Sequence, residues 1–228
     1  MAFTDPQFWI SLLQIIWINI ILSGDNAIVI ALACRSLPAR QQKLGIFYGS
    51  LGAIVLRIIL TVFAVYLLSQ PYLKLIGSAL LMWIAVKLLL QEDEKESVSG
   101  GNANLIAAIK TIIIADLVMS LDNVIAVAAA AKGSLALLVI GLVISMPLII
   151  YGSTLLTRVM ARFPIIITLG GALLGYVAGE MAVTDPILVS WVETTMPVLH
   201  SIVPITCAVV VVIVGKLLSV KITSKEVL

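Results

Sequence analysis

The sequence has few of the residues that cover the surface of a water-soluble protein. Only 11% of its 228 residues are charged, while 61% are apolar, against roughly 25% and 45–50% in a soluble domain. Such a chain would leave most of a water-facing surface apolar, so the composition excludes a soluble enzyme and a disordered segment. The net charge of +2 is also too small to indicate a nucleic-acid-binding protein.

Cysteine and histidine are scarce as well. Cys34 and Cys207 are the two cysteines, and neither belongs to a C-x-x-C motif, so they form neither a disulfide framework nor a typical zinc site. The single histidine, His200, lies at the start of an apolar run rather than inside one. Inside its apolar segments the chain therefore offers oxygen atoms as ligands, and not paired sulfur atoms or imidazole nitrogen.

Long apolar runs take the place of the missing polar residues. Each run is long enough to cross a bilayer as a helix, at about 1.5 Å per residue. Polar breaks that end in proline, at residues 69–71 and 162–164, separate neighbouring runs, and proline is well tolerated where a helix begins. The fold predicted is an all-α, polytopic membrane protein. Its seven expected helices lie at about residues 7–33, 44–68, 72–90, 105–131, 135–157, 165–183 and 199–220.

Lysine and arginine are unevenly distributed between the two sides of these helices. Lys74 and Lys132 fall on one side. Many more fall on the other side, namely Arg35, Arg40, Lys43, Lys95, Arg158, Arg162, Lys216, Lys221 and Lys225. Because basic loops stay in the cytoplasm, we expect the N-terminus outside and the C-terminus inside.

The sequence contains two related copies of one polar motif. The recurring positions are Asn19, Ser23, Asp25 and Asn26 in the first copy and Asp116, Ser120, Asp122 and Asn123 in the second. A Gly-x-Ala-Leu pattern at residues 77–80 recurs at 170–173, in the same order along the chain. Each copy carries three predicted helices, an odd number, so the second copy should cross the membrane in the opposite sense.

This arrangement is an inverted-topology repeat, in which the substrate site lies near the bilayer midplane where the copies meet. We expect a single transmembrane domain over residues 1–228, made of repeat 1 at 7–90, a cytoplasmic linker at 91–104 and repeat 2 at 105–183. The helix at 199–220 stands outside the repeat.

Ionisable residues lie inside the predicted spans, where each costs several kcal/mol unless it is paired or hydrated. They are Asp25, Arg57, Asp116, Asp122 and Glu180. A helix break at residues 23–24 would turn the first aspartate toward its polar neighbours and free backbone carbonyl groups as ligands. The second copy has Leu121 in place of Gly24, so its break should be milder or absent.

The donor atoms of the motif are carboxylate, amide and hydroxyl oxygens. Such a set favours Mg²⁺, Ca²⁺ or Mn²⁺ in roughly octahedral coordination over Zn²⁺, Cu⁺ or Ni²⁺. Asp25 and Asp122 together would neutralise a divalent cation, and Asp116 would attract the ion or accept a proton.

Several of these polar residues also fit other roles. Asn19, Ser23 and Ser120 fit interhelical hydrogen bonding equally well. Arg57 fits either a structural ion pair, with Glu180 or Asp116 as partner, or a direct role in transport. Glu180 itself fits an exit path or a water-exposed position.

Residues 22–27, Leu-Ser-Gly-Asp-Asn-Ala, and residues 120–123, Ser-Leu-Asp-Asn, resemble the paired Asp-Asn signatures of the TerC family. These are bacterial integral membrane proteins placed in the LysE-like exporter superfamily, and the resemblance covers about residues 7–220. It implies a multi-pass protein of the inner membrane that exports Mn²⁺, in preference to Ca²⁺, Mg²⁺ or Fe²⁺, and needs no organic cofactor. Carried over by position, the metal site is Asp25, Asn26, Asp122 and Asn123, followed by Asn19 and Asp116.

The function expected is Mn²⁺ export by alternating access between the first and fourth helices, with proton antiport as a hypothesis for coupling. Three other functions are alternatives. One is an intramembrane aspartyl protease, another is an exporter of a small organic cation or amino acid, and the third is a module that hands metal to the secretion machinery for secreted enzymes. The residues leave open whether the chain forms a homo-oligomer.

Overall fold

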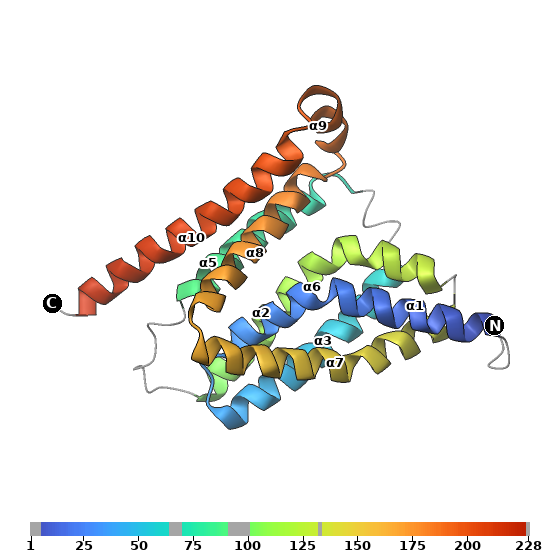
Figure 1. Cartoon of the computed structure of the whole chain (residues 1–228), viewed down its shortest axis with the longest axis horizontal. Helices are drawn as coiled ribbons and strands as arrows, with labels where there is room; N and C mark the ends of the chain where they lie inside the picture. The colour runs from blue at the N-terminus through green and yellow to red at the C-terminus, as the bar shows by residue number, and fades with distance from the viewer. Residues whose placement is uncertain (1–5, 64–69, 91–100, 132–133, 227–228) are drawn as a thin grey trace.

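The computed structural model describes residues 6–63, 70–90, 101–131 and 134–226, and every regular element in these ranges is a helix (Figure 1). The helices are α1 Pro6–Leu22, α2 Gly24–Cys34, α3 Ala39–Val62, α5 Leu73–Leu90, α6 Gly101–Ala131, α7 Leu135–Arg162, α8 Ile165–Val183, α9 Val189–Thr195 and α10 Leu199–Glu226. Among the described residues, six helices are long and apolar enough to cross a membrane, or seven if the bent pair α1 and α2 forms one span. The all-α, polytopic prediction is therefore confirmed.

The helix bounds differ from the predicted spans mainly at their polar ends. α8 has the predicted bounds, whereas α3 begins at Ala39 and α7 continues to Arg162, beyond the apolar runs. Hydropathy marks only the part of a helix that lies in hydrocarbon, while good helix formers such as alanine and arginine extend it into the interface. α6 likewise begins inside the predicted linker, of which residues 91–100 lie outside the described part. The short helix α9 was not predicted.

The helices form two groups (Figure 1). α5, α8 and α10 lie side by side, and α1, α3, α6 and α7 form the other group. Glycine lets α8 and α10 approach closely, because a Cβ atom at Gly175 would lie 2.8 Å from the carbonyl oxygen of Cys207, and one at Gly179 only 2.5 Å from Cα of Pro204. Small residues at such spacing are typical of helix contacts within membranes.

α2 is enclosed between the two groups, since it contacts α3, α6, α7 and α8. From Val29 to Cys34 its residues are buried, and Leu32 and Cys34 have no exposed surface. These residues belong to the main core cluster, together with Leu88, Ile112 and Leu174 from three other helices. The bend between α1 and α2 therefore places the first copy of the motif at the start of the buried helix α2.

Candidate functional site

The first span is broken at the polar motif. α1 ends at Leu22, α2 begins at Gly24, and their axes meet at 50°. Glycine is about 1 kcal/mol less favourable than alanine within a helix, so Gly24 weakens the helix at this point. In the second copy Leu121 takes the place of Gly24, and α6 continues unbroken through it. The structure confirms the break in the first copy, and in the second copy, where a milder or absent break was predicted, it is absent.

The asparagines of the two copies meet at this break. Nδ2 of Asn26 donates to the carbonyl oxygen of Leu22 at 3.4 Å, and Nδ2 of Asn123 donates to the same oxygen at 3.3 Å. Asn123 reaches the break from α6, which passes beside α1 and α2. The two asparagines, which occupy equivalent positions of the motif, therefore share one backbone oxygen.

Arg57 of α3 carries a positive charge into the interior, where it is only 3% exposed. Its Nη2 atom donates to Oδ1 of Asp116 at 2.5 Å, which forms a buried ion pair. Nη1 donates to Oδ1 of Asn19 at 2.6 Å and to Oγ of Ser23 at 3.2 Å, and Nε donates to Oγ of Ser120 at 3.1 Å. The guanidinium thus contacts two pairs of equivalent positions, one residue of each pair from each copy.

Further hydrogen bonds hold this cluster in place. Oγ of Ser120 donates to Oδ2 of Asp116 at 3.0 Å. Nδ2 of Asn19 donates to Oγ of Ser145, on α7, at 2.5 Å. The sequence analysis missed Ser145, because a lone serine in an apolar run has no periodic signal to distinguish it. Four helices, α1, α3, α6 and α7, therefore contribute to one buried polar network.

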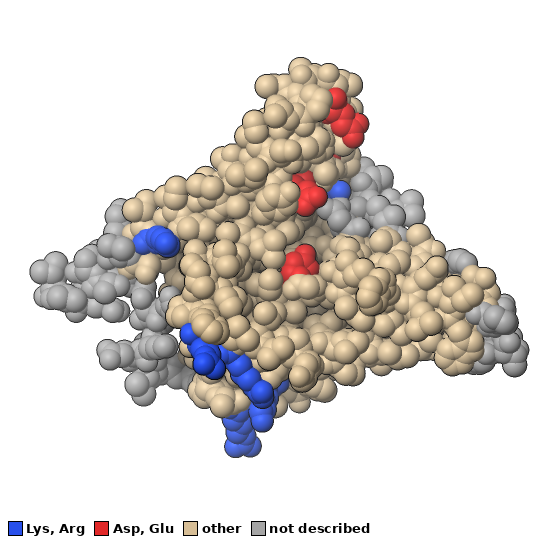
Figure 2. Space-filling model, viewed as in Figure 1, with Lys and Arg blue, Asp and Glu red and all other residues tan. Residues whose placement is uncertain are grey.

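Of the two acids predicted as ion-pair partners of Arg57, one is buried beside it and the other is exposed. Arg57 forms its ion pair with Asp116, which was one of the two predicted partners. Glu180 of α8 is exposed instead. Acidic side chains appear in the hollow between α8 and α10 on one side and α1 and α2 on the other (Figure 2). Glu180 therefore belongs to the surface of the molecule rather than to the buried network.

Asp25 lies in the first turn of α2 and is partly exposed. Its Oδ1 atom accepts a hydrogen bond from the backbone N–H of Asn26 at 2.8 Å. The side chain of the matching residue, Asp122, lies outside the described part of the structure, although its backbone belongs to α6.

A cavity of about 10 Å³ adjoins the network, between α2 and α6. Asn26 and Asp116 line it together with apolar side chains. Asn26 is 4% exposed, and its Oδ1 atom has no hydrogen-bond partner. A cavity of this size holds about one water molecule. An unpartnered amide oxygen and a carboxylate beside such a space are suitable donors for a small cation or for its water.

No three histidine, cysteine, aspartate or glutamate side chains gather closely enough to hold a metal among the described residues. Any cation bound here would therefore take amide, hydroxyl or backbone oxygens in addition to carboxylates. The polar groups at the break and around the cavity are of these kinds, which fits a hard cation better than a soft one.

Asp185 is a buried acid that the sequence analysis missed. It follows α8 and has no exposed surface. Its carboxylate accepts backbone N–H groups of Tyr72, Lys74 and Leu75 at 3.1–3.2 Å, so it caps the start of α5. An aspartate followed by Pro186 just after a helix is typical of a turn, and this was the available signal. The cap fixes α5 to the end of α8 and is structural.

Comparison with known proteins places this sequence in a family. The sequence model described as "Integral membrane protein TerC family" matches residues 4–224. The chain is 44% identical to the uncharacterized membrane protein YjbE of Bacillus subtilis, over 86% of this chain and 92% of that protein. It is 27% identical to the uncharacterized membrane protein YceF of Bacillus subtilis, over 61% of this chain and 58% of that protein.

A further relative is the UPF0053 inner membrane protein YgdQ of Escherichia coli, 29% identical over 54% of this chain and 59% of that protein. No solved structure matches the chain. The family model covers nearly the whole sequence, and the relatives are membrane proteins of bacteria. The chain therefore belongs to the TerC family of integral membrane proteins, a transporter-like family.

Proposed function

We propose that this chain exports a divalent metal cation across the bacterial inner membrane, with Mn²⁺ as the expected substrate. The observation that carries the proposal is the oxygen cage around Arg57. Oxygen atoms from equivalent positions of both motif copies surround one buried positive charge. These oxygen atoms compensate the guanidinium, since an unpaired buried charge costs several kcal/mol. The motif oxygens that Arg57 leaves free, such as Oδ1 of Asn26, remain for a substrate cation.

In this proposal the substrate binds beside the cage and not in place of Arg57. Asp25 and Asp122 supply negative charge, and Asn26 and Asn123 supply amide oxygens. Support comes from the unpartnered Oδ1 of Asn26 and from the meeting of both asparagines at the Leu22 carbonyl. Carboxylate and amide oxygens are the ligands that Mn²⁺ shares with other hard cations.

Arg57 then acts as a fixed positive charge that sets how strongly the site holds its substrate. It neutralises Asp116, which also lines the cavity next to Asn26. A site with all its carboxylates unpaired would bind a divalent cation too tightly to release it. The ion pair therefore lowers the net negative charge that faces the substrate.

Transport requires that the site open to each side in turn. In inverted-repeat transporters this happens when one group of helices rocks against the other. The two helix groups of this chain, with α2 between them, suit such a movement (Figure 1). The partly exposed Asp25 and the exposed Glu180 lie on helices that border the hollow of Figure 2, which we assign to the outer path.

Coupling to protons follows from the chemistry of the donors. Carboxylates bind a metal cation when they are ionised and release it when they are protonated. An inward flow of protons would therefore drive the cation outward. Mn²⁺ transport that responds to an imposed pH gradient in proteoliposomes is the expected result, and transport independent of that gradient would remove the coupling.

Transport into proteoliposomes tests the proposal. We expect Mn²⁺ uptake by the wild-type chain and a fall of at least tenfold for Asp25→Asn and for Asp122→Asn, because each change removes one of the two proposed ligand charges. Glu193→Gln is the matched control, since Glu193 is an exposed acid of α9, and it should transport normally. Equal rates in all four proteins, or uptake of an amino acid in place of metal, would contradict the proposal.

A further inference from the structure

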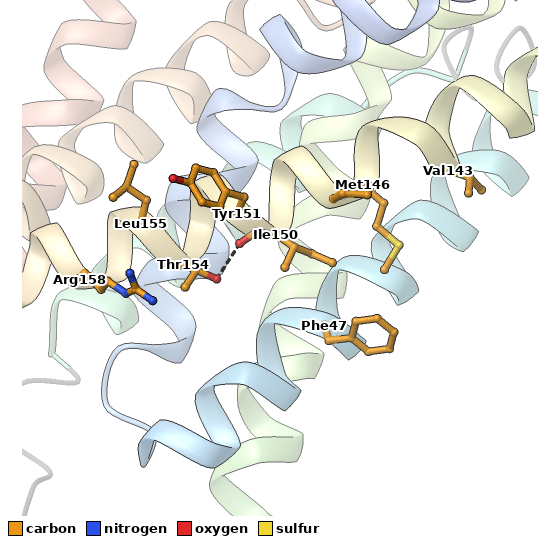
Figure 3. Close-up of a pocket in the computed structure, with 9 residues that line it drawn as sticks. Phe47, Val143, Met146, Ile150, Tyr151, Thr154, Leu155 and Arg158 are labelled. Atoms are coloured by element: carbon orange, nitrogen blue, oxygen red, sulfur yellow. Dashed lines mark hydrogen bonds between the residues drawn. The ribbon is translucent and has the colours of Figure 1, made fainter.

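A groove of about 560 Å³ runs along the outer face of α7, next to α3 (Figure 3). Its lining extends from Val143 to Arg158 of α7, and Phe47 of α3 completes it. Its volume lies in the range of small-molecule sites, roughly 300–1,000 Å³. It is distinct from the buried network, because Ser145, the residue of α7 that binds Asn19, does not line it.

The lining of the groove changes in polarity along its length. Toward the start of α7 the lining side chains are apolar, as at Val143, Met146 and Ile150. Toward the end of α7 the lining includes, beside Leu155, hydroxyl groups and a guanidinium, at Tyr151, Thr154 and Arg158. Figure 3 shows Arg158 at one end of this row and Val143 at the other. The gradient, apolar at one end and cationic at the other, is that of a site for an amphiphile with an anionic head.

The length of the groove matches one leaflet of a bilayer. The helical rise of about 1.5 Å per residue places Val143 about 22 Å from Arg158 along α7. A leaflet with its headgroups is about 20–22 Å thick, half of a bilayer of about 40–45 Å. With Arg158 at one membrane surface, the groove would end near the middle of the membrane, whereas a membrane-spanning partner helix would need a complementary surface across both leaflets. A single lipid of one leaflet therefore fits better than a second protein.

Positive charge gathers at the polar end. Arg162 follows Arg158 by one turn of α7, and Lys43 precedes Phe47 by one turn of α3, and all three basic side chains are exposed. Figure 2 shows lysine and arginine side chains clustered where α7 ends and α3 begins. The positive-inside rule assigns this end to the cytoplasm, where basic pockets between membrane helices attract anionic headgroups.

We propose that the groove binds one anionic phospholipid, with its phosphate at Arg158 and an acyl chain along α7 as far as Val143. The lipid would fill the space at Pro147, which lies inside α7 and has no backbone N–H to donate to a hydrogen bond. It covers apolar side chains that α3 and α7 leave uncovered, and it holds these two helices at a fixed separation.

Native mass spectrometry of the purified full chain, mixed with phosphatidylglycerol or with phosphatidylcholine, tests this. We expect one phosphatidylglycerol molecule to be retained and phosphatidylcholine to be lost. Arg158→Gln should weaken phosphatidylglycerol binding about fivefold, the effect of one basic residue at a membrane surface. Lys216→Gln, which removes an exposed charge from α10, should leave binding unchanged.

A second pair of variants tests the apolar end. Val143→Trp fills the groove and should also displace the lipid, whereas Ile144→Trp adds the same bulk to a neighbouring exposed side chain that does not line the groove. Equal retention of the two lipids, or unchanged binding in both Arg158→Gln and Val143→Trp, would overturn the proposal. A dimer in solution whose crosslinks fall on groove residues would overturn it as well.

Discussion

Replacing Asp116 by asparagine tests whether the ion pair with Arg57 is as buried as the structure indicates. The substitution preserves the shape of the side chain but leaves the guanidinium, 3% exposed, without a counter-charge. Asn19, Ser23 and Ser120 still accept its hydrogen bonds. They are neutral, however, and do not compensate for a buried charge that has lost its ionic partner.

Breaking a buried ion pair by removing one partner costs about 3–5 kcal/mol. Because asparagine still accepts a hydrogen bond, we expect a loss near the lower limit, about 3 kcal/mol. In a domain of 150–250 residues each kcal/mol lowers the melting temperature by about 2–4 °C, so Asp116→Asn should melt roughly 6–12 °C below the wild type.

The assay is thermal unfolding of the purified protein in detergent, with two further variants. A double variant, Arg57→Met with Asp116→Leu, removes both charges and should recover most of the loss, since apolar replacements of a whole buried pair are often neutral. Glu180→Gln removes an exposed acid and should change the melting temperature little. If Asp116→Asn melts within about 1 °C of the wild type, or the double variant is less stable than Asp116→Asn, Arg57 and Asp116 do not form a buried ion pair.

Three other changes test separate parts of the structure. Gly179→Ala places a Cβ atom against the backbone of Pro204, so it should separate α8 from α10 and lower stability by about 1–3 kcal/mol in the same assay; an unchanged melting temperature would refute this contact. Asp185→Ala removes the cap of α5 and takes the acceptor away from three partly buried backbone N–H groups, which should cost about 2 kcal/mol, again by thermal unfolding. Gly24→Leu meets open space and should fold, yet it favours a straight helix at the break, so Mn²⁺ uptake should fall while stability does not; full activity would show that the break is dispensable.

The fold was largely predictable because hydrocarbon imposes simple requirements on a sequence. A span must be apolar and long enough, and this alone located the helices from Leu73 to Leu90 and from Ile165 to Val183. The same requirement does not apply to segments outside the hydrocarbon core of the membrane, so the start of α3 at Ala39 and the short helix α9 were not predicted. The inverted relation of the two copies stays a prediction.

The candidate site was predictable where it depends on residues that are energetically unfavourable within a membrane helix. A buried arginine needs an acid, and this narrowed the partner of Arg57 to two residues, one of which the structure confirms. The glycine at position 24 predicted the break for a similar reason, because leucine replaces it in the unbroken copy. The sequence marks Asp185 only as a turn residue and does not mark Ser145 at all, since each bonds a residue more than one hundred positions away and no local pattern records such a contact.

The proposed site requires that the two motif copies together bind a hard divalent cation. Mn²⁺ binding to the purified chain, measured by the loss of the electron paramagnetic resonance signal of free Mn²⁺, tests it without any need for transport. We predict saturable binding of Mn²⁺ that Asp25→Asn and Asp122→Asn each weaken at least tenfold, while Glu193→Gln binds as the wild type does. Equal affinity in all four proteins, or no binding by the wild type, would show that the two motif copies do not form a metal site.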